Sequence, residues 1–262
     1  MKRTERLRPC EGVTLLELLV VLTIIVVLSA LTLAVLRTAR SRGDAAQCVN
    51  NLRVLSEANI RYSADNNGHF CFAMDKSNRV RWHGARVTVE TPFDATKGPL
   101  APYLGREGRV KACPSFQQML EGTYSFEEGA GGYGYNAVYI GGTTVNRWEA
   151  ELISNVENPT LTVMFADTAF ALRDGLQEYP FAEPWKTVSI RGRLTDPLQP
   201  SVHFRHQGLA NVAWCDGHVS AEKPSSLVGP NFYGGDNQKH KVGWFGPREE
   251  NGYWNPKRTI RE

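Results

Sequence analysis

The sequence has little net charge. Its 30 lysine and arginine residues nearly balance 27 aspartate and glutamate residues, which leaves a formal charge of +3 over 262 residues. A domain that binds nucleic acid usually carries a strongly basic face, so we exclude nucleic acid as an expected partner. The mean hydropathy is negative, which indicates that most of the chain forms a polar, soluble body.

The sequence also lacks a complete catalytic or metal-binding motif. His203, His206 and His218 lie near Asp216, but no acidic pair, nucleophile elbow or full zinc motif accompanies them. The glycine-rich stretch 129–132 is not flanked by a strand and a helix, as a dinucleotide-binding loop would be. We therefore expect no enzyme activity, no cofactor and no metal ligands.

Cysteine is scarce, with five residues in the chain. Cys10 lies in the amino-terminal segment discussed below. Cys48, Cys71, Cys113 and Cys215 remain, and on the oxidising side of a membrane they could form two disulfides in any of three pairings. Free buried thiols are equally compatible with the sequence.

A hydrophobic run covers residues 13–36. About 20 apolar residues suffice to cross the hydrocarbon core of a bilayer as a helix, so we expect a single membrane-spanning helix here. The run holds one carboxylate, Glu17, near its start. An ionised carboxylate inside a membrane is unfavourable unless it has a partner, so Glu17 indicates a function.

The segment before the run is a basic leader, residues 1–12, which ends in Gly12; residues 13–17 then read Val-Thr-Leu-Leu-Glu. This arrangement resembles the prepilin signal of type IV pilins and type II secretion pseudopilins. The resemblance implies that a prepilin peptidase cuts between Gly12 and Val13 and that the new amino terminus is N-methylated. Val13 departs from the Phe or Met that is usual in the family. Glu17 would become the fifth mature residue.

Two other interpretations of the run fit it less well. A secretory signal peptide has an apolar core of roughly 7–15 residues and a small-residue exit, whereas this run is longer and contains Glu17. A plain signal anchor fits the length but leaves Glu17 unexplained. Basic residues flank both ends of the run, so charge does not orient it. A single pass through the inner membrane, with the body in the periplasm or drawn into a filament, is what the resemblance implies.

Two roles for Glu17 remain open. In pilin-like filaments the apolar helices bundle together, and the Glu17 carboxylate could pair there with the freed α-ammonium of Val13 on a neighbouring subunit. Such a pair would fix the axial register of the subunits. Alternatively, Glu17 lies at headgroup depth, near the positive end of its own helix dipole.

The helix is expected to continue beyond the membrane as a stem. Apolar residues recur at spacings of three and four over residues 37–62, which is typical of one helix face. Gly43 and Asp44 would kink or briefly interrupt the stem. The turn-forming residues 63–68 would then end it.

The body, residues 63–262, is predicted to be β-rich with long loops. The fold class is thus α+β, with a long amino-terminal helix packed on a small antiparallel sheet, as in pilins. The predicted strands are His69–Ala73, Arg86–Glu90, Tyr133–Ile140, Thr143–Trp148, Leu161–Ala166 and Leu209–Cys215. Residues 168–201 and the tail from Pro224 onward are predicted to be irregular.

A second motif lies near the carboxyl terminus, where nine residues separate His206 from Asp216-Gly217. This C-terminal signature (His206, Asp216 and Gly217) resembles the H-x9-D-G pattern of a large family of prepilin-type proteins that share a domain of unknown function. Further segments of resemblance are Cys48–Leu52, Cys113–Ser115, Tyr133–Asn136 and Met164–Asp167.

We expect the signature to be structural, with Asp216-Gly217 as a two-residue type I′ hairpin turn. Trp214 would then face Val219, and both would lie on the core face. The predicted pairs and core residues are Cys215 with His218, Trp214 with Val219, and Val212 with Ala221, with Val212, Trp214, Val219 and Ala221 on one face.

A metal or hydrolytic site built from His203, His206, Asp216 and His218 is the alternative. A strand over residues 209–215 would place its ends roughly 20 Å apart, so His206 and Asp216 could share an ion only if the chain folded back. The major type II pseudopilins, which this architecture resembles, bind calcium through a carboxy-terminal loop, but no residue here can be matched to those ligands.

Three functions follow. The first is a pseudopilin-like structural subunit of a type II secretion or type IV pilus-like machine, whose partners are the prepilin peptidase and other pilin-like subunits. The second is a minor tip subunit that binds cargo or glycans, motivated by an aromatic tail. The third is a membrane-anchored metallohydrolase. The tail residues are Trp244, Phe245, Tyr253 and Trp254.

Overall fold

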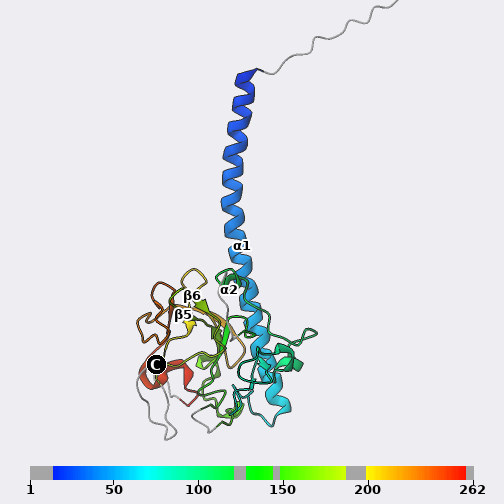
Figure 1. Cartoon of the computed structure of the whole chain (residues 1–262), viewed down its shortest axis with the longest axis vertical. Helices are drawn as coiled ribbons and strands as arrows, with labels where there is room; N and C mark the ends of the chain where they lie inside the picture. The colour runs from blue at the N-terminus through cyan, green and yellow to red at the C-terminus, as the bar shows by residue number, and fades with distance from the viewer. Residues whose placement is uncertain (1–13, 121–127, 144–147, 187–198, 258–262) are drawn as a thin grey trace, which may run out of the picture. The chain divides into compact units, whose positions relative to one another are not determined.

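The computed structural model describes residues 14–120, 128–143, 148–186 and 199–257. The chain divides into two units, residues 1–43 and residues 44–262 (Figure 1). Gly12 and Val13, between which the predicted cut falls, lie outside the described residues, as does the rest of the leader.

The described part of the first unit belongs to helix α1 (Leu15–Asp65), apart from Thr14 before its first turn. Its segment Leu15–Leu33 is long and apolar enough to cross a membrane, and none of that segment is buried. Gly43 and Asp44 lie within α1. The helix therefore continues through these residues, where an interruption was predicted.

Helix α1 ends at Asp65, slightly later than the sequence predicted. Asn67 and Gly68 follow with φ angles of +53° and +82°. Gly68 N donates a hydrogen bond to Ser63 O at 2.9 Å. A left-handed residue just past the last turn is a common way to stop a helix and satisfy its final carbonyl groups.

The second unit contains an antiparallel sheet with the strand order β3-β4-β8-β9. Its strands are β3 (Tyr133–Tyr135), β4 (Val163–Asp167), β8 (Ala210–Trp214) and β9 (Val219–Glu222). The fold class is therefore α+β, as predicted: an apolar amino-terminal helix with small antiparallel sheets.

Short elements complete the described part of the second unit. Paired short strands are β1 (Val80–Arg81) with β2 (Gly84–Ala85), β5 (Phe170–Leu172) with β6 (Gly175–Gln177), and β7 (Val202–His203) with β10 (Val242–Gly243). The short helices are α2 (Pro114–Gln117) and the 3-10 turns η1 (Ala95–Lys97), η2 (Ala101–Tyr103), η3 (Ile153–Asn155), η4 (Pro159–Leu161) and η5 (Glu249–Trp254).

The central strands lie between two hydrophobic cores, since every residue of β4 and β8 is buried. We call these the stem core and the tail core. The stem core joins Leu52 and Leu55 of α1 to Tyr135 of β3. The tail core joins Trp214 of β8 to aromatic residues near the carboxyl terminus.

Three of the four predicted tail aromatics belong to this tail core, and the fourth, Tyr253, is partly buried and packs against it. Trp244, Phe245 and Trp254 are buried. The indole Nε1 atoms of Trp244 and Trp254 donate to Pro184 O and Ala182 O, both at 3.1 Å. Tryptophan buries a large apolar ring favourably when its single N–H group finds an acceptor. The tail therefore closes the second face of the sheet.

Several strand predictions were wrong. His69–Ala73 forms no strand, and His69 makes only an isolated bridge with Leu152. Residues 86–90 form bends and turns. The predicted strand 133–140 continues as a turn after Tyr135, and most of the predicted strand 143–148 lies outside the described residues. Residues 168–201, which were predicted to be irregular, contain the β5–β6 hairpin.

The turn between β8 and β9 differs from the predicted type I′ turn. Gly217 N donates to Trp214 O at 2.9 Å, and Trp214 N donates to His218 O at 3.0 Å. The loop therefore has three residues, of which Gly217 alone has a positive φ, +92°. A type I turn followed by a left-handed residue is the usual three-residue hairpin, whereas type I′ also needs a positive φ at the residue before the glycine.

This extra loop residue shifts the strand register by one. Ala213 pairs with Val219, and Val212 pairs with Ser220. Val219 packs against the stem core, whereas Val212 and Trp214 belong to the tail core. The predicted shared face is therefore wrong, because a one-residue slip moves side chains to the opposite face of a sheet.

Candidate functional site

The start of α1 is held by Thr14 and Glu17. Thr14 N and Oγ1 each donate to Glu17 Oε2 at 2.9 Å, and Glu17 N donates to Thr14 Oγ1 at 3.3 Å. This reciprocal arrangement is a capping box, which satisfies N–H groups that have no partner within the helix. In a single chain, the carboxylate of Glu17 thus has a local partner.

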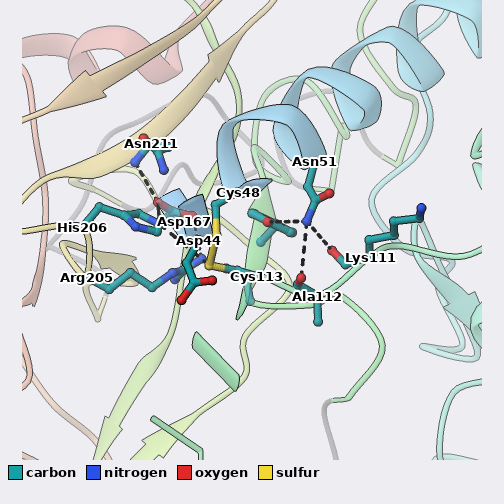
Figure 2. Close-up of a disulfide and its surroundings, with 12 residues drawn as sticks. Asp44, Cys48, Asn51, Lys111, Ala112, Cys113, Asp167, Arg205, His206 and Asn211 are labelled. Atoms are coloured by element: carbon teal, nitrogen blue, oxygen red, sulfur yellow. Dashed lines mark hydrogen bonds and ion pairs between the residues drawn. A yellow bond between two sulfur atoms is a disulfide. The ribbon is translucent and has the colours of Figure 1, made fainter. Parts of the chain in front are cut away.

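A disulfide ties the stem to the body. Cys48 on α1 bonds to Cys113, the residue before α2, and their Cα atoms lie 5.1 Å apart (Figure 2). Both residues are fully buried. The sequence left three pairings of the four body cysteines open. The structure contains the Cys48–Cys113 bond, which belongs to one of these pairings.

The other two cysteines of the body are free thiols. Cys71 and Cys215 are buried, and burial raises the pKa of each thiol. A thiol must ionise to act as a nucleophile. These two side chains therefore serve as small apolar groups in the stem core.

Next to the disulfide lies a buried charged cluster, shown in Figure 2. Asp167 Oδ1 accepts a hydrogen bond from Arg205 Nη2 at 2.5 Å, and Asp167 Oδ2 accepts one from Asn211 N at 2.7 Å. His206 Nε2 lies 3.3 Å from Asp167 Oδ2 and 3.8 Å from Cys113 Sγ. Both members of the Asp167–Arg205 pair have fully buried side chains. Asp167 thus connects β4, β8 and the segment that carries His206.

Two asparagines on α1 bind the two tyrosines of β3. Asn51 Nδ2 donates to Tyr133 Oη at 3.1 Å and to the carbonyl oxygens of Lys111 and Ala112 at 3.2 and 3.3 Å (Figure 2). In the same way, Asn59 Nδ2 donates to Tyr135 Oη at 3.0 Å. Buried hydroxyl and amide groups need such partners. The Tyr-Gly-Tyr stretch therefore fixes the sheet on the stem.

The C-terminal signature contacts the stem at two levels. His206 lies against the disulfide of Cys48. At the other end, a Cβ atom built on Gly217 would lie 3.6 Å from Ile60 Cδ1. From Cys48 to Ile60 the helix rises about 18 Å, which is close to the roughly 17 Å that the five residues of β8 span. The nine-residue spacing thus matches the length of stem that β8 follows.

The histidines and Asp216 do not form one site. Asp216 Oδ1 lies 2.7 Å from His218 Nδ1 and accepts from His218 N at 3.1 Å, at the hairpin loop. His203 is buried beside Phe116, with ring centroids 5.9 Å apart. Burial and the neighbouring guanidinium of Arg205 hold the pKa of His203 well below its usual range. His206 and Asp216 lie at opposite ends of β8.

A different set of possible metal ligands lies at the disulfide. One donor atom each from Cys48, Cys113 and His206 lies within 4.8 Å of the others. Both sulfurs are joined to each other, and metal ions bind the thiolate form of cysteine. In the oxidised protein these two cysteines therefore cannot act as thiolate ligands of a metal ion.

The amino terminus is the part of the chain that comparison with known proteins identifies. Residues 7–33 match the prokaryotic N-terminal methylation motif. The chain has a prepilin-type amino terminus. No curated protein and no solved structure matches the chain.

The prepilin-type amino terminus includes Gly12, Val13 and Glu17 and extends to the end of the apolar segment Leu15–Leu33. Such a motif implies processing by a prepilin peptidase, anchoring in a membrane and pilin-like assembly. The match does not extend into residues 44–262, so the motif gives no information about ligands of the body.

Proposed function

We propose that this chain is a pseudopilin-like structural subunit of a type II secretion or type IV pilus-like machine. The apolar segment of residues 13–36 anchors the precursor in the inner membrane by a single pass, with the body in the periplasm. After processing, association of these helices draws subunits into a filament. The driving force is packing of apolar surface, and the proposal asks no catalysis of this chain.

One observation carries the proposal: the methylation motif coincides with the apolar span Leu15–Leu33 and precedes a folded, disulfide-bonded body. Disulfides persist in the periplasm and are rare in the cytosol, which supports a periplasmic body. The aromatic tail gives no support to a tip subunit, because Trp244, Phe245 and Trp254 are buried. The histidines lie apart from one another, so they give no support to a hydrolase.

The cut between Gly12 and Val13 is tested on protein purified from its membrane. Mass spectrometry of the amino-terminal peptide should show a chain that begins with N-methylated Val13. Replacement of Gly12 by a bulky residue should leave the leader attached. Recovery of the unmodified chain, beginning with Met1, in cells that contain an active prepilin peptidase would refute the proposal.

The role of Glu17 is tested by two matched variants. Glu17→Gln removes the charge but keeps a side chain that can close the capping box, whereas Thr14→Ala breaks the box and keeps the charge. If Glu17 pairs with the α-ammonium of a neighbour, Glu17→Gln should abolish cross-linked oligomers and Thr14→Ala should retain them. Only fully processed protein is compared.

Equal oligomer yield for wild type and Glu17→Gln would assign Glu17 to the start of its own helix. Loss of oligomers in Thr14→Ala alone would lead to the same conclusion. Either outcome would leave the processing result, and hence the prepilin assignment, unaffected.

A further inference from the structure

A cavity of about 490 Å³ lies at the carboxyl end of the stem helix. Aromatic rings of Tyr62, Phe72 and Trp148 line it, together with Met74. Its volume is within the range of about 300–1,000 Å³ typical of small-ligand sites. We call it the aromatic pocket.

Trp148 stands in this pocket with an unusual backbone. Its φ is +75°, in the left-handed region that bulky residues rarely adopt. The residue is 38% exposed. Conformations of this kind persist only where the surroundings impose them, and they gather at functional sites.

Neighbouring contacts hold Trp148 in place. Trp148 N donates to Gly142 O at 2.8 Å, and Ala73 N donates to Gly141 O at 3.1 Å. Gly142 itself admits no side chain, because a Cβ atom there would lie 1.7 Å from Glu149 O. The chain thus closes tightly around this point and carries a tryptophan where glycine or asparagine would adopt the backbone more easily.

The three rings do not contact one another, and polar residues line the pocket with them. Among the described residues, no ring contact joins any two of Tyr62, Phe72 and Trp148, and the ring of Tyr62 contacts Tyr103 instead, at 5.8 Å. His69 and Glu149 also line the pocket. His69 Nδ1 lies 2.8 Å from Ala150 O, which fixes the imidazole. Flat apolar faces and hydrogen-bonding groups therefore surround one space.

We propose that the aromatic pocket binds a sugar ring of a neutral glycan. A pyranose offers apolar C–H faces to Tyr62, Phe72 and Trp148, and hydroxyl groups at its edge to His69 and Glu149. Peptides more often bind along a sheet edge or in a helix-sized groove, and this pocket is formed by loops and a helix end.

This binding role goes beyond the proposed structural function and does not depend on it. The test uses the full chain in a zwitterionic detergent without a sugar headgroup. Isothermal titration is carried out with cellotetraose, maltotetraose and chitotetraose. At least one should bind, with a dissociation constant of about 1 mM or tighter. Trp148→Ala should weaken that binding at least tenfold, and Trp148→Phe should weaken it less.

Two further variants keep the result interpretable. Phe232→Ala changes an aromatic residue that is 76% exposed and outside the pocket, and it should bind as wild type does. Trp148→Asn should abolish binding while the melting temperature stays the same or rises, because asparagine tolerates the left-handed backbone. Lost binding with a raised melting temperature cannot result from misfolding.

Failure of all three sugars to bind the wild type would overturn the proposal, as would equal binding by Trp148→Ala. Binding of a random peptide library that is lost in Trp148→Ala, without any sugar binding, would assign the pocket to a peptide and also reject the glycan. Processing at Gly12 is measured separately, so failure here leaves the proposed function standing.

Discussion

At the scale of single residues, Asp167 is a charged group that is fully removed from solvent. It is fully buried, and its carboxylate receives the guanidinium of Arg205 and the backbone N–H of Asn211. A buried ion pair is only weak evidence of net stabilisation. Removing one member, however, leaves an uncompensated charge in a medium that solvates it poorly.

Asp167→Asn should therefore lower the free energy of unfolding by about 3–5 kcal/mol. The measurement is urea unfolding of the full chain in detergent, followed by tryptophan fluorescence. Glu107→Gln, which removes an exposed ion pair with Arg109, should change stability little. Similar effects of the two variants would show that the Arg205 pair is not the main contribution of Asp167.

Glu178 predicts a pH dependence. Burial raises the pKa of this carboxyl from 4.5 to about 7, although backbone N–H groups of Ala130, Gly131 and Gly132 act in the opposite direction. A folded-state pKa above the unfolded value means that the contribution to stability is complete below about pH 4.5 and is lost as the pH rises through 7. Relative to Glu178→Gln, wild type should lose about 3 kcal/mol between pH 4.5 and pH 8.

Unfolding midpoints of both proteins at several pH values check this prediction. Glu183, whose pKa burial also raises, is present in both proteins and cancels in the difference. A constant difference between the two proteins from pH 4.5 to pH 8 would contradict the raised pKa of Glu178.

The sequence could point to His206, Asp216 and Gly217 through their spacing, but it could not reveal what they contact. Asp167 is separated from Arg205 by 38 residues and from Asn211 by 44. Periodicity reports only which residues share a face within one element. The partners of a buried charge are set by which strands become neighbours, and this is a property of the topology.

At the scale of elements, the stem helix depends on its link to the body. The bond between Cys48 and Cys113 closes a loop with a sequence separation of 65 residues. Such a loop restricts the unfolded chain, and its chain-entropy contribution is about 4 kcal/mol.

The double variant Cys48→Ser/Cys113→Ser should therefore lose about 4 kcal/mol of unfolding free energy. Peptide mapping without reduction should find the pair in wild type. Cys71→Ser, at a free cysteine of the same core, serves as the control whose stability must remain sensitive to reductant. Wild type that is equally stable with and without reductant would contradict the prediction.

Glycines in loops offer a second test at this scale. Gly142 and Gly208 both have positive φ, +71° and +86°, but a Cβ on Gly208 would meet no atom within 4 Å. Gly208→Ala should thus cost about 1–2 kcal/mol, from the backbone alone. Gly142→Ala, which adds a clash with Glu149 O, should cost roughly 3 kcal/mol or more. Equal losses in unfolding experiments would exclude the clash.

The strands show why the element predictions succeeded only in part. Positions within 133–135, 163–166 and 210–214 were identified, because runs of apolar and β-branched residues favour strands. Alternation could not give the register, since β8 is buried on both faces. At residues 86–90 the pattern resembled a strand, but the segment forms bends and turns in the structure.

At the scale of the whole molecule, the chain combines an apolar anchor, suited to a lipid environment, with a body suited to water. The segment Leu15–Leu33 is apolar and unburied, whereas residues 44–262 enclose two cores of their own. A helix of that length and hydropathy partitions into the bilayer.

The full chain should therefore sediment with membranes and resist extraction at high salt. A chain that begins at Asp44 should remain in the aqueous phase with the disulfide intact. Fractionation followed by peptide mapping tests both expectations. Retention of the shortened chain in the membrane after a carbonate wash would show that the body itself binds lipid.

The long separations within the body have a consequence for biogenesis. In the proposed topology, in which the body is exported from its amino-terminal side, Cys48 and Asn51 would leave the membrane well before their partners, which follow 65 and 82 residues later. At about 5–20 residues per second, several seconds pass before Tyr133 arrives. Cys71 would then emerge before Cys113, as a free thiol able to form a non-native disulfide with Cys48. On that topology, we expect cells that make this protein in quantity to need a disulfide isomerase, and chaperones that shield the nascent stem from proteases.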